Sequence, residues 1–148
     1  YRRCASIMVF RHTEYGKYEF LLLHKPRKRD DWQLPQGGCE GSETTEQAAL
    51  RELQEEAGIT AEIFGKSANQ YKYDFPTSYR RFRPDNVCGQ CIQFVFALIK
   101  EGEEVQVDQD EIDDYKWICI EDLDRYLKRD VYHKLVSTMF EEGIKFLA

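Results

Sequence analysis

The sequence predicts an α/β fold in which helices sandwich a mixed β-sheet. Strand-like segments lie on both sides of a helix predicted for residues 44–56, and two further helices are predicted near the end of the chain. Elements in this order bury their apolar faces best as a sheet between helical layers. The chain has 148 residues, of which 42% are hydrophobic, so it is long enough for one core. We expect a single domain over residues 1–148 and leave open a longer parent chain, because the sequence starts at Tyr1 without Met.

The predicted strands are short apolar segments bounded by polar or turn-forming residues. In chain order they are residues 4–10, 18–24, 61–64, 67–75, 90–100 and 115–120, and residues 30–36 form a brief extended piece that leads into the loop before the helix. Residues 90–100 (QCIQFVFALIK) are apolar at both odd and even positions. This pattern predicts a central strand that is covered on both faces.

Loops and two helices complete the predicted order. Residues 76–89 form a long polar connection, and connections longer than about 12 residues are often functional. A short helix is predicted from Glu121 to about residue 128. A final helix is predicted over residues 131–142, with Gly143 beyond its end.

The helix predicted for residues 44–56 is framed by turn and capping residues. Gly37, Gly38 and Gly41 precede it and permit tight turns. Ser42 or Thr44 can cap its first turn, and Gly58 is suited to end it.

Three glutamates lie close together on this helix. At about 100° per residue, Glu52, Glu55 and Glu56 share an arc about 100° wide, next to an arc of apolar residues. An acidic helix is most often a solvated face. Like charges this close destabilise a helix by a few tenths of a kcal/mol per pair, and hard divalent cations with oxygen ligands can offset that repulsion.

The whole spacing resembles the signature of the Nudix hydrolases, G-x5-E-x7-R-E-U-x-E-E-x-G-U, in which U is a bulky apolar residue. The matching residues are Gly37, Glu43, Arg51, Glu52, Leu53, Glu55, Glu56, Gly58 and Ile59. The resemblance implies the Nudix α/β/α sandwich with a mixed sheet. It also implies a hydrolase that uses Mg²⁺ or Mn²⁺ to cleave a P–O–P bond in a nucleoside diphosphate linked to another group. The family often has its second glycine one place later than Gly41.

Segments outside the signature look like one Nudix branch, which holds RNA 5′-pyrophosphohydrolases and dinucleoside tetraphosphate hydrolases. Residues 73–76 (YDFP) and 128–132 (KRDVY) discriminate best. The main function implied is release of pyrophosphate from the 5′-triphosphate end of RNA. One alternative is asymmetric hydrolysis of diadenosine tetraphosphate (Ap4A). Another is a Nudix-fold module that binds RNA or nucleotide within a larger complex of protein partners.

Two departures from this branch concern base recognition. Leu127 stands where the bacterial RNA enzymes carry an aromatic residue that helps to hold bases. Residues 25–27 (KPR) replace a pair of arginines.

The resemblance also implies roles for individual residues. Metal ligands are expected at Glu52, Glu55, Glu56 and Glu111 and at the carbonyl of Gly37 or, as the alternative, Gly38. Glu56, Glu55 and Glu111 are the catalytic candidates, and the sequence leaves open which of them acts as the base. Glu111 can also be read as one more charge in an acidic loop. Arg51 is expected on the opposite side of the helix from the carboxylates, where it pairs with Glu43 and braces the loop.

Phosphate contacts are expected from basic residues, because guanidinium and ammonium groups bind phosphate oxygens. The candidates are Arg2, Lys25, Arg27, Lys128 and Arg129; each can also be a solvated surface cation. Tyr73, Phe75 and Tyr79 are candidates for stacking on a base, although aromatic residues in strands are more often part of the core.

Composition limits the other classes of function. A net charge of −6 argues against non-specific wrapping of long nucleic acid, while local basic clusters suit a compact polyanion. The chain has five cysteines, an odd number without framework spacing, which indicates free thiols in an intracellular, reducing compartment, cytoplasmic or mitochondrial. Residues 88–91 (CGQC) have no second pair that would complete a zinc site. No apolar run reaches the roughly 18 residues of a membrane span.

Overall fold

The computed structural model describes residues 1–26, 32–74, 89–128 and 130–148. Within these ranges the strands are β1 (Arg2–His12), β2 (Tyr18–His24), β3 (Trp32–Gln33), β4 (Gln36–Gly38), β5 (Ala61–Asp74), β6 (Gly89–Ile99) and β7 (Asp114–Ile118). The helices are α1 (Thr45–Ala57), a 3-10 turn η1 (Ile120–Asp122), α3 (Leu123–Tyr126) and α4 (Asp130–Leu147).

All the described strands belong to one mixed sheet. Its main order is β3-β2-β1-β6-β5, while β4 pairs with β1 and β7 pairs with β2. β1 and β6 run parallel, and the other pairs are antiparallel. The predicted mixed sheet is therefore confirmed.

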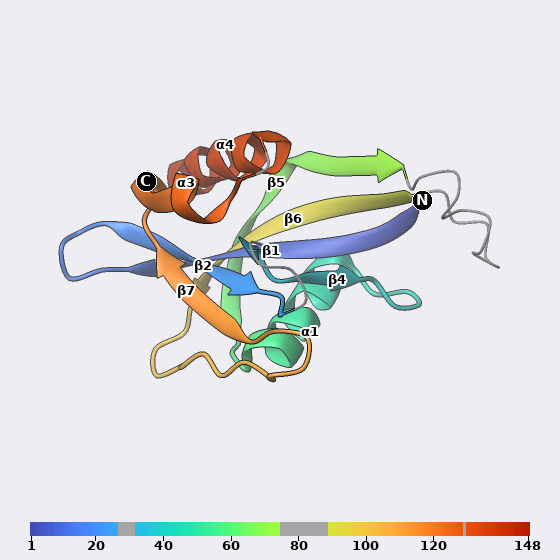
Figure 1. Cartoon of the computed structure of the whole chain (residues 1–148), viewed down its shortest axis with the longest axis horizontal. Helices are drawn as coiled ribbons and strands as arrows, with labels where there is room; N and C mark the ends of the chain where they lie inside the picture. The colour runs from blue at the N-terminus through green and yellow to red at the C-terminus, as the bar shows by residue number, and fades with distance from the viewer. Residues whose placement is uncertain (27–31, 75–88, 129) are drawn as a thin grey trace.

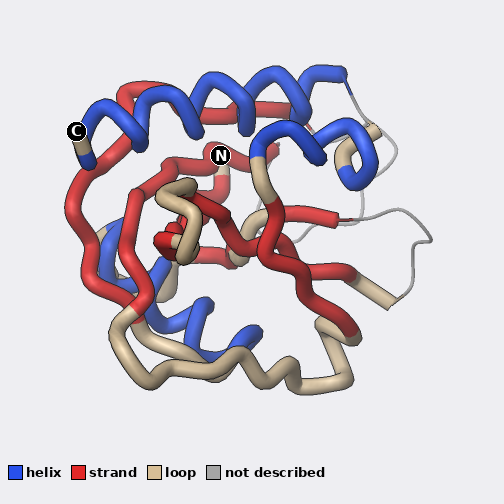
Figure 2. The backbone as a smooth tube through the Cα atoms, turned by 90° about the vertical axis from the view of Figure 1, so that its left-hand side faces the viewer, coloured by secondary structure: helices blue, strands red, loops and turns tan. Residues whose placement is uncertain are grey.

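Helices cover both faces of this sheet. α3 and α4 lie over one face and α1 lies under the other (Figures 1 and 2). Successive side chains of a strand point to opposite faces, so Met8 and Phe10 of β1 pack toward α4, while Ile7 and Val9 pack toward α1. β6 lies between β1 and β5 and contributes to both cores, as its apolar pattern predicted.

The end of the last helix differs from the prediction. α4 continues through Gly143 to Leu147, so the stop predicted before Gly143 is wrong. A Cβ atom at Gly143 would lie 2.7 Å from the ring of Phe10 and 3.1 Å from that of Phe96. Gly143 is thus a point of close approach between helix and sheet, and it does not end the helix.

Two other boundaries also differ. The strands predicted for residues 61–64 and 67–75 form the single strand β5, whose pairing with β6 shifts register between Lys66 and Gln70. Glu142 of α4 accepts hydrogen bonds there, at 2.6 Å from the Ser67 hydroxyl and 2.8 Å from the Ala68 N–H. The helix predicted from Glu121 begins as η1 at Ile120 and ends with α3 at Tyr126.

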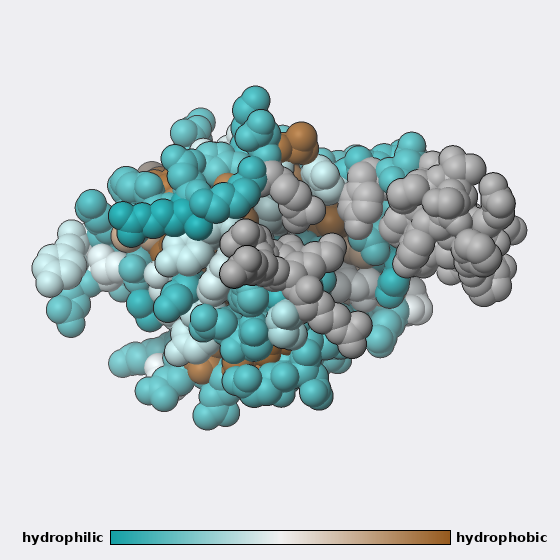
Figure 3. All heavy atoms as spheres, in the orientation of Figure 1, coloured by the Kyte–Doolittle hydropathy of each residue, from teal (hydrophilic) through white to brown (hydrophobic). Residues whose placement is uncertain are grey.

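The surface is mostly hydrophilic on the face drawn in Figure 3. In the described part of the chain, no helix is both long and apolar enough to span a bilayer. The described cysteines are free thiols, and Cys88 lies outside the described residues.

Candidate active site

The start of α1 is fixed by a capping box. The Thr44 hydroxyl accepts from the Gln47 N–H at 3.1 Å, and the Gln47 side chain accepts from the Thr44 N–H at 3.0 Å. Thr44, and not Ser42, is therefore the N-cap. Gly58 ends the helix in the left-handed conformation, with φ of 67°.

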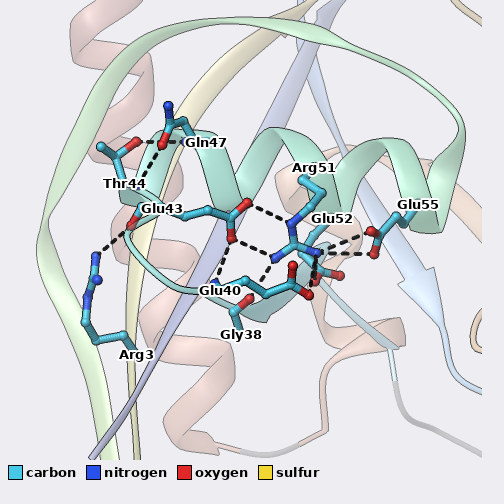
Figure 4. Close-up of polar contacts among 9 residues, drawn as sticks. All are labelled: Arg3, Gly38, Glu40, Glu43, Thr44, Gln47, Arg51, Glu52 and Glu55. Carbon is cyan, nitrogen blue, oxygen red and sulfur yellow. Dashed lines mark hydrogen bonds and ion pairs between the residues drawn. The ribbon is translucent and has the colours of Figure 1, made fainter.

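Arg51 links the loop to the carboxylates of α1 (Figure 4). Its Nε and Nη2 donate to the two oxygens of Glu43 at 2.8 and 3.0 Å, and Nη2 also donates to the Gly38 carbonyl at 2.8 Å. Arg51 holds the pKa of Glu43 at about 2, far below its usual value. The pairing expected from the sequence is present.

The same guanidinium also reaches two of the clustered glutamates. Arg51 Nη1 lies 2.8 Å from Glu52 Oε1 and 3.3 Å from Glu55 Oε1. The expectation that Arg51 lies opposite the carboxylates is therefore wrong. Arg51 and Glu55 are four residues apart and so occupy neighbouring positions on the helix surface.

Two glycines of β4 provide room for charged side chains. The Glu52 carboxylate occupies the space that a side chain at Gly37 would need. A Cβ at Gly38 would lie 2.5 Å from Nη2 of Arg2. Both positions therefore need glycine because neighbouring charged groups lie against the backbone.

A cleft of about 1120 Å³ brings together six of the predicted site residues. Those that line it are Arg2, Lys25, Gly37, Glu52, Glu56 and Glu111. Two predicted residues are not among its described lining. The Glu55 side chain is 58% exposed and turned to Arg51, and Lys128 donates to the Asp124 carbonyl. Arg27, Phe75, Tyr79, Arg129 and the side chain of Tyr73 lie outside the described residues.

Glu56 is the most enclosed carboxylate of the cleft, with 3% exposure. Burial raises its pKa to about 8 against the lowering effect of the Gln36 N–H, which donates to it at 3.0 Å. The charges of Glu52 and Glu111 raise this pKa further. Burial also raises the pKa of Glu52. The carboxylates of Glu52, Glu56 and Glu111 are therefore close enough to repel one another.

A tight turn presents Glu111 to the cleft. Asp108 Oδ1 accepts three backbone N–H groups, from Asp110 at 3.1 Å, Glu111 at 3.2 Å and Ile112 at 3.0 Å. Ile112 is fully buried and anchors the turn. Aspartate often forms such turns, because its side chain can accept hydrogen bonds from the backbone that follows it. Asp108 was therefore a sequence signal that Glu111 is held in place.

The next residue joins this turn to the end of β2. The Asp113 N–H donates to the His24 carbonyl at 3.1 Å, and its carboxylate lies 2.7 Å from His24 Nδ1.

We compared the sequence with models of known protein families. A model described as "NUDIX domain" matches residues 1–138. The chain belongs to the Nudix family. Its mixed sheet between helices is the Nudix α/β fold.

Curated relatives match along nearly the whole chain. An RNA pyrophosphohydrolase of Sulfurovum sp. is 31% identical over 97% of this chain and 96% of the relative. An RNA pyrophosphohydrolase of Bartonella tribocorum is 35% identical over 93% of this chain and 88% of the relative. Among solved structures, a C. elegans Ap4A hydrolase binary complex has a TM-score of 0.75 at 24% identity, covering 97% of this chain and 99% of that chain. That last similarity supports the fold alone.

Nudix hydrolases use divalent metal ions, and the donors of this cleft fit one. Carboxylate and carbonyl oxygens are the ligands that hard cations prefer, and a cation would offset the repulsion among the glutamates. Within the described ranges, no three His, Cys, Asp or Glu side chains converge as a metal-binding group. Instead, Glu52 and Glu55 contact Arg51, and Glu56 accepts a hydrogen bond from the Gln36 N–H.

Other cleft residues of this Nudix protein had no predicted role. They are Cys4, Pro26, Gln33, Gln36, Tyr71, Gln90, Ile92, Asp110, Asp130, Val131 and Tyr132. They come from separate strands, loops and α4, so no sequence spacing connects them. Leu127 is 5% exposed and belongs to the core, so it packs inward where the bacterial RNA enzymes carry an aromatic residue.

Proposed function

We propose that this Nudix hydrolase releases pyrophosphate from the 5′-triphosphate end of RNA and leaves a 5′-monophosphate. The observation that carries the proposal is one cleft in which Glu52, Glu56 and Glu111 lie together with the cations Arg2 and Lys25. Carboxylates can hold divalent ions, and the two cations can hold phosphate oxygens. The similarity to proteins named RNA pyrophosphohydrolase supports RNA as the substrate.

Five groups are the proposed holders of Mg²⁺ or Mn²⁺. They are the carboxylates of Glu52, Glu55, Glu56 and Glu111 and the carbonyl of Gly37. When bound, the ions neutralise charge on the phosphate oxygens and lower the pKa of bound water. In the reaction a water oxygen forms a bond to phosphorus, the bridging P–O bond breaks and pyrophosphate leaves. Glu56 is the proposed acceptor of the water proton, with Glu55 and Glu111 as the other candidates.

The triphosphate is held by Arg2 and Lys25 in this proposal. Arg2 lies against Gly38 of β4 and lines the cleft, which supports its proposed contact with phosphate oxygens. Arg27, Lys128 and Tyr73 are proposed to contact the RNA beyond the triphosphate. Glu43 and Arg51 have a structural role, in which their ion pair keeps the Gly38 carbonyl and the loop in place.

One assay tests the substrate. The protein is incubated with Mg²⁺ or Mn²⁺ and either 5′-triphosphorylated RNA or Ap4A, and products are separated over time. We expect pyrophosphate and 5′-monophosphate RNA, with little cleavage of Ap4A. Faster cleavage of Ap4A would favour the dinucleotide alternative. Binding of both substrates without turnover would favour a binding module.

A further inference from the structure

Gln33 occupies a buried position in the wall of the cleft. It lies in β3 and pairs with Leu23 of β2, so its side chain points to the same face of the sheet as that of Leu23. This is the face covered by α1, which carries Glu52 and Glu56. Gln33 is 6% exposed and lines the cleft.

The amide nitrogen of Gln33 has no hydrogen-bond partner. Among the described residues it is the one buried side-chain nitrogen or oxygen in this condition. Buried donors are nearly always paired, because the bonds to water lost on burial must be replaced. An unpaired donor at a cleft is therefore explained if a ligand supplies the missing acceptor.

Two carboxylates of the cleft already accept hydrogen bonds from other groups. Glu56 accepts from the Gln36 N–H, and Glu52 accepts from Arg51. The phosphate oxygens of a polyphosphate are acceptors without hydrogens of their own, and Lys25 and Arg2 line the same cleft to balance their charge. The terminal torsion of a glutamine is broad, so its amide can turn toward a ligand at little cost.

We propose that Gln33 is a substrate-binding residue whose amide nitrogen donates a hydrogen bond to a phosphate oxygen of the polyphosphate. The proposal rests on the polyphosphate chemistry of the proposed function and does not depend on RNA as the substrate. Gln33 adds a neutral donor to a site whose other phosphate contacts carry charge. It thereby fixes the orientation of the phosphate chain.

The test separates ligand binding from stability. Gln33→Met keeps the length of the side chain and removes the unpaired donor, so the melting temperature should stay the same or rise. Affinity for a methylene-bridged, non-hydrolysable triphosphate, measured calorimetrically with Mg²⁺, should fall about 10- to 100-fold. Gln33→Glu places an acceptor where the donor was and should bind the analogue more weakly still.

Gln93→Met is the matched control. Gln93 is half-buried in β6, does not line the cleft, and accepts from the Thr45 hydroxyl at 2.6 Å. Its replacement should lower the melting temperature and leave the affinity unchanged.

Either of two results would overturn the proposal. One is a Gln33→Met protein that melts as low as the control. The other is wild-type affinity in Gln33→Met or Gln33→Glu. Failure of the RNA assay is distinguishable, because a wild-type protein that binds the analogue through Gln33 but leaves RNA intact would refute only the RNA substrate.

Discussion

Glu56 is buried in the cleft and is the proposed acceptor of the water proton, so replacing its carboxyl group should strongly lower activity. Glu56→Gln retains the shape of the side chain and its acceptor for the Gln36 N–H but cannot accept a proton. Losing a general base typically lowers rates by about 10²- to 10⁴-fold. We expect a loss of this size in kcat on 5′-triphosphorylated RNA with an unchanged fold by circular dichroism. Glu62→Gln, at an exposed position of β5, serves as the control, and near-normal turnover of Glu56→Gln would refute the assignment.

The pKa of Glu56 also predicts how the stability of the protein depends on pH when divalent ions are absent. The pKa of Glu56 is about 8 in the folded protein, above its ordinary value of 4.5. Its contribution to stability is therefore fully present below pH 4.5 and is lost as the pH rises through about 8. Glutamine does not titrate.

In the presence of chelator, the melting temperature of the wild-type protein should therefore fall relative to that of Glu56→Gln as the pH rises from about 5 to about 9. A difference between the two proteins that stays constant with pH would contradict this cause.

At the scale of elements, the Asp108 turn determines where Glu111 lies. Asp108→Ala removes the acceptor of three backbone N–H groups while Ile112 remains buried. We expect kcat to fall about tenfold and the free energy of unfolding to fall by about 1–2 kcal/mol, since solvent can satisfy part of the lost bonding. Glu104→Ala changes an exposed charge in the same loop and should leave both quantities unchanged. An active Asp108→Ala enzyme would show that the turn does not position Glu111.

The close contact between α4 and the sheet predicts that replacing Gly143 by alanine destabilises the protein, which is the opposite of the usual effect in a helix. Gly→Ala in a helix interior normally stabilises by about 1 kcal/mol. At Gly143 the new methyl would press on the rings of Phe10 and Phe96, both of which are fully buried. Overpacking of this kind costs about 1–3 kcal/mol, so Gly143→Ala should destabilise the protein in urea unfolding.

Thr138→Ala, at an exposed position of the same helix, should stabilise slightly. If Gly143→Ala also stabilised the protein, the close approach of α4 to β1 would be wrong.

Local chemistry made some of these elements predictable from sequence, and tertiary contact made others unpredictable. Thr44 and Gly58 mark the ends of α1 because caps act within one turn, and the strong apolar pattern of residues 90–100 marked β6 as central. Gly143 resembles a helix end until Phe10, more than 130 residues earlier in the chain, is placed beneath it. The contact of Arg51 with Glu55 follows from their i,i+4 spacing, whereas its contact with the adjacent Glu52 depends on a side-chain conformation that helix geometry alone does not specify.

At the scale of the whole molecule, the cleft exists only because distant segments meet. Its described wall combines the start of β1, the residues just after β2, strands β3 to β6, α1, the Glu111 loop and the first turn of α4. The signature spacing predicted the carboxylates, since they lie on one helix. It could not predict Gln33 or Val131, which join the wall through the sheet order and the packing of α4 (Figure 1).

This assembly of like charges makes the stability of the whole protein responsive to divalent ions. An ion that binds only the folded state adds RT ln(1 + [L]/Kd), about 2.7 kcal/mol at 100 times Kd. Mg²⁺ or Mn²⁺ should therefore raise the melting temperature in a saturable way, and chelator should reverse the shift and abolish pyrophosphate release. NaCl at equal ionic strength only screens exposed charge and should have a much smaller effect.

The shift should shrink strongly in Glu52→Gln and persist in Glu62→Gln, because only the first change touches the cleft. If Glu52→Gln kept the full shift, the ions would bind elsewhere. Another group would then have to offset the repulsion among Glu52, Glu56 and Glu111. In the described structure Arg51 contacts only the first of these three residues.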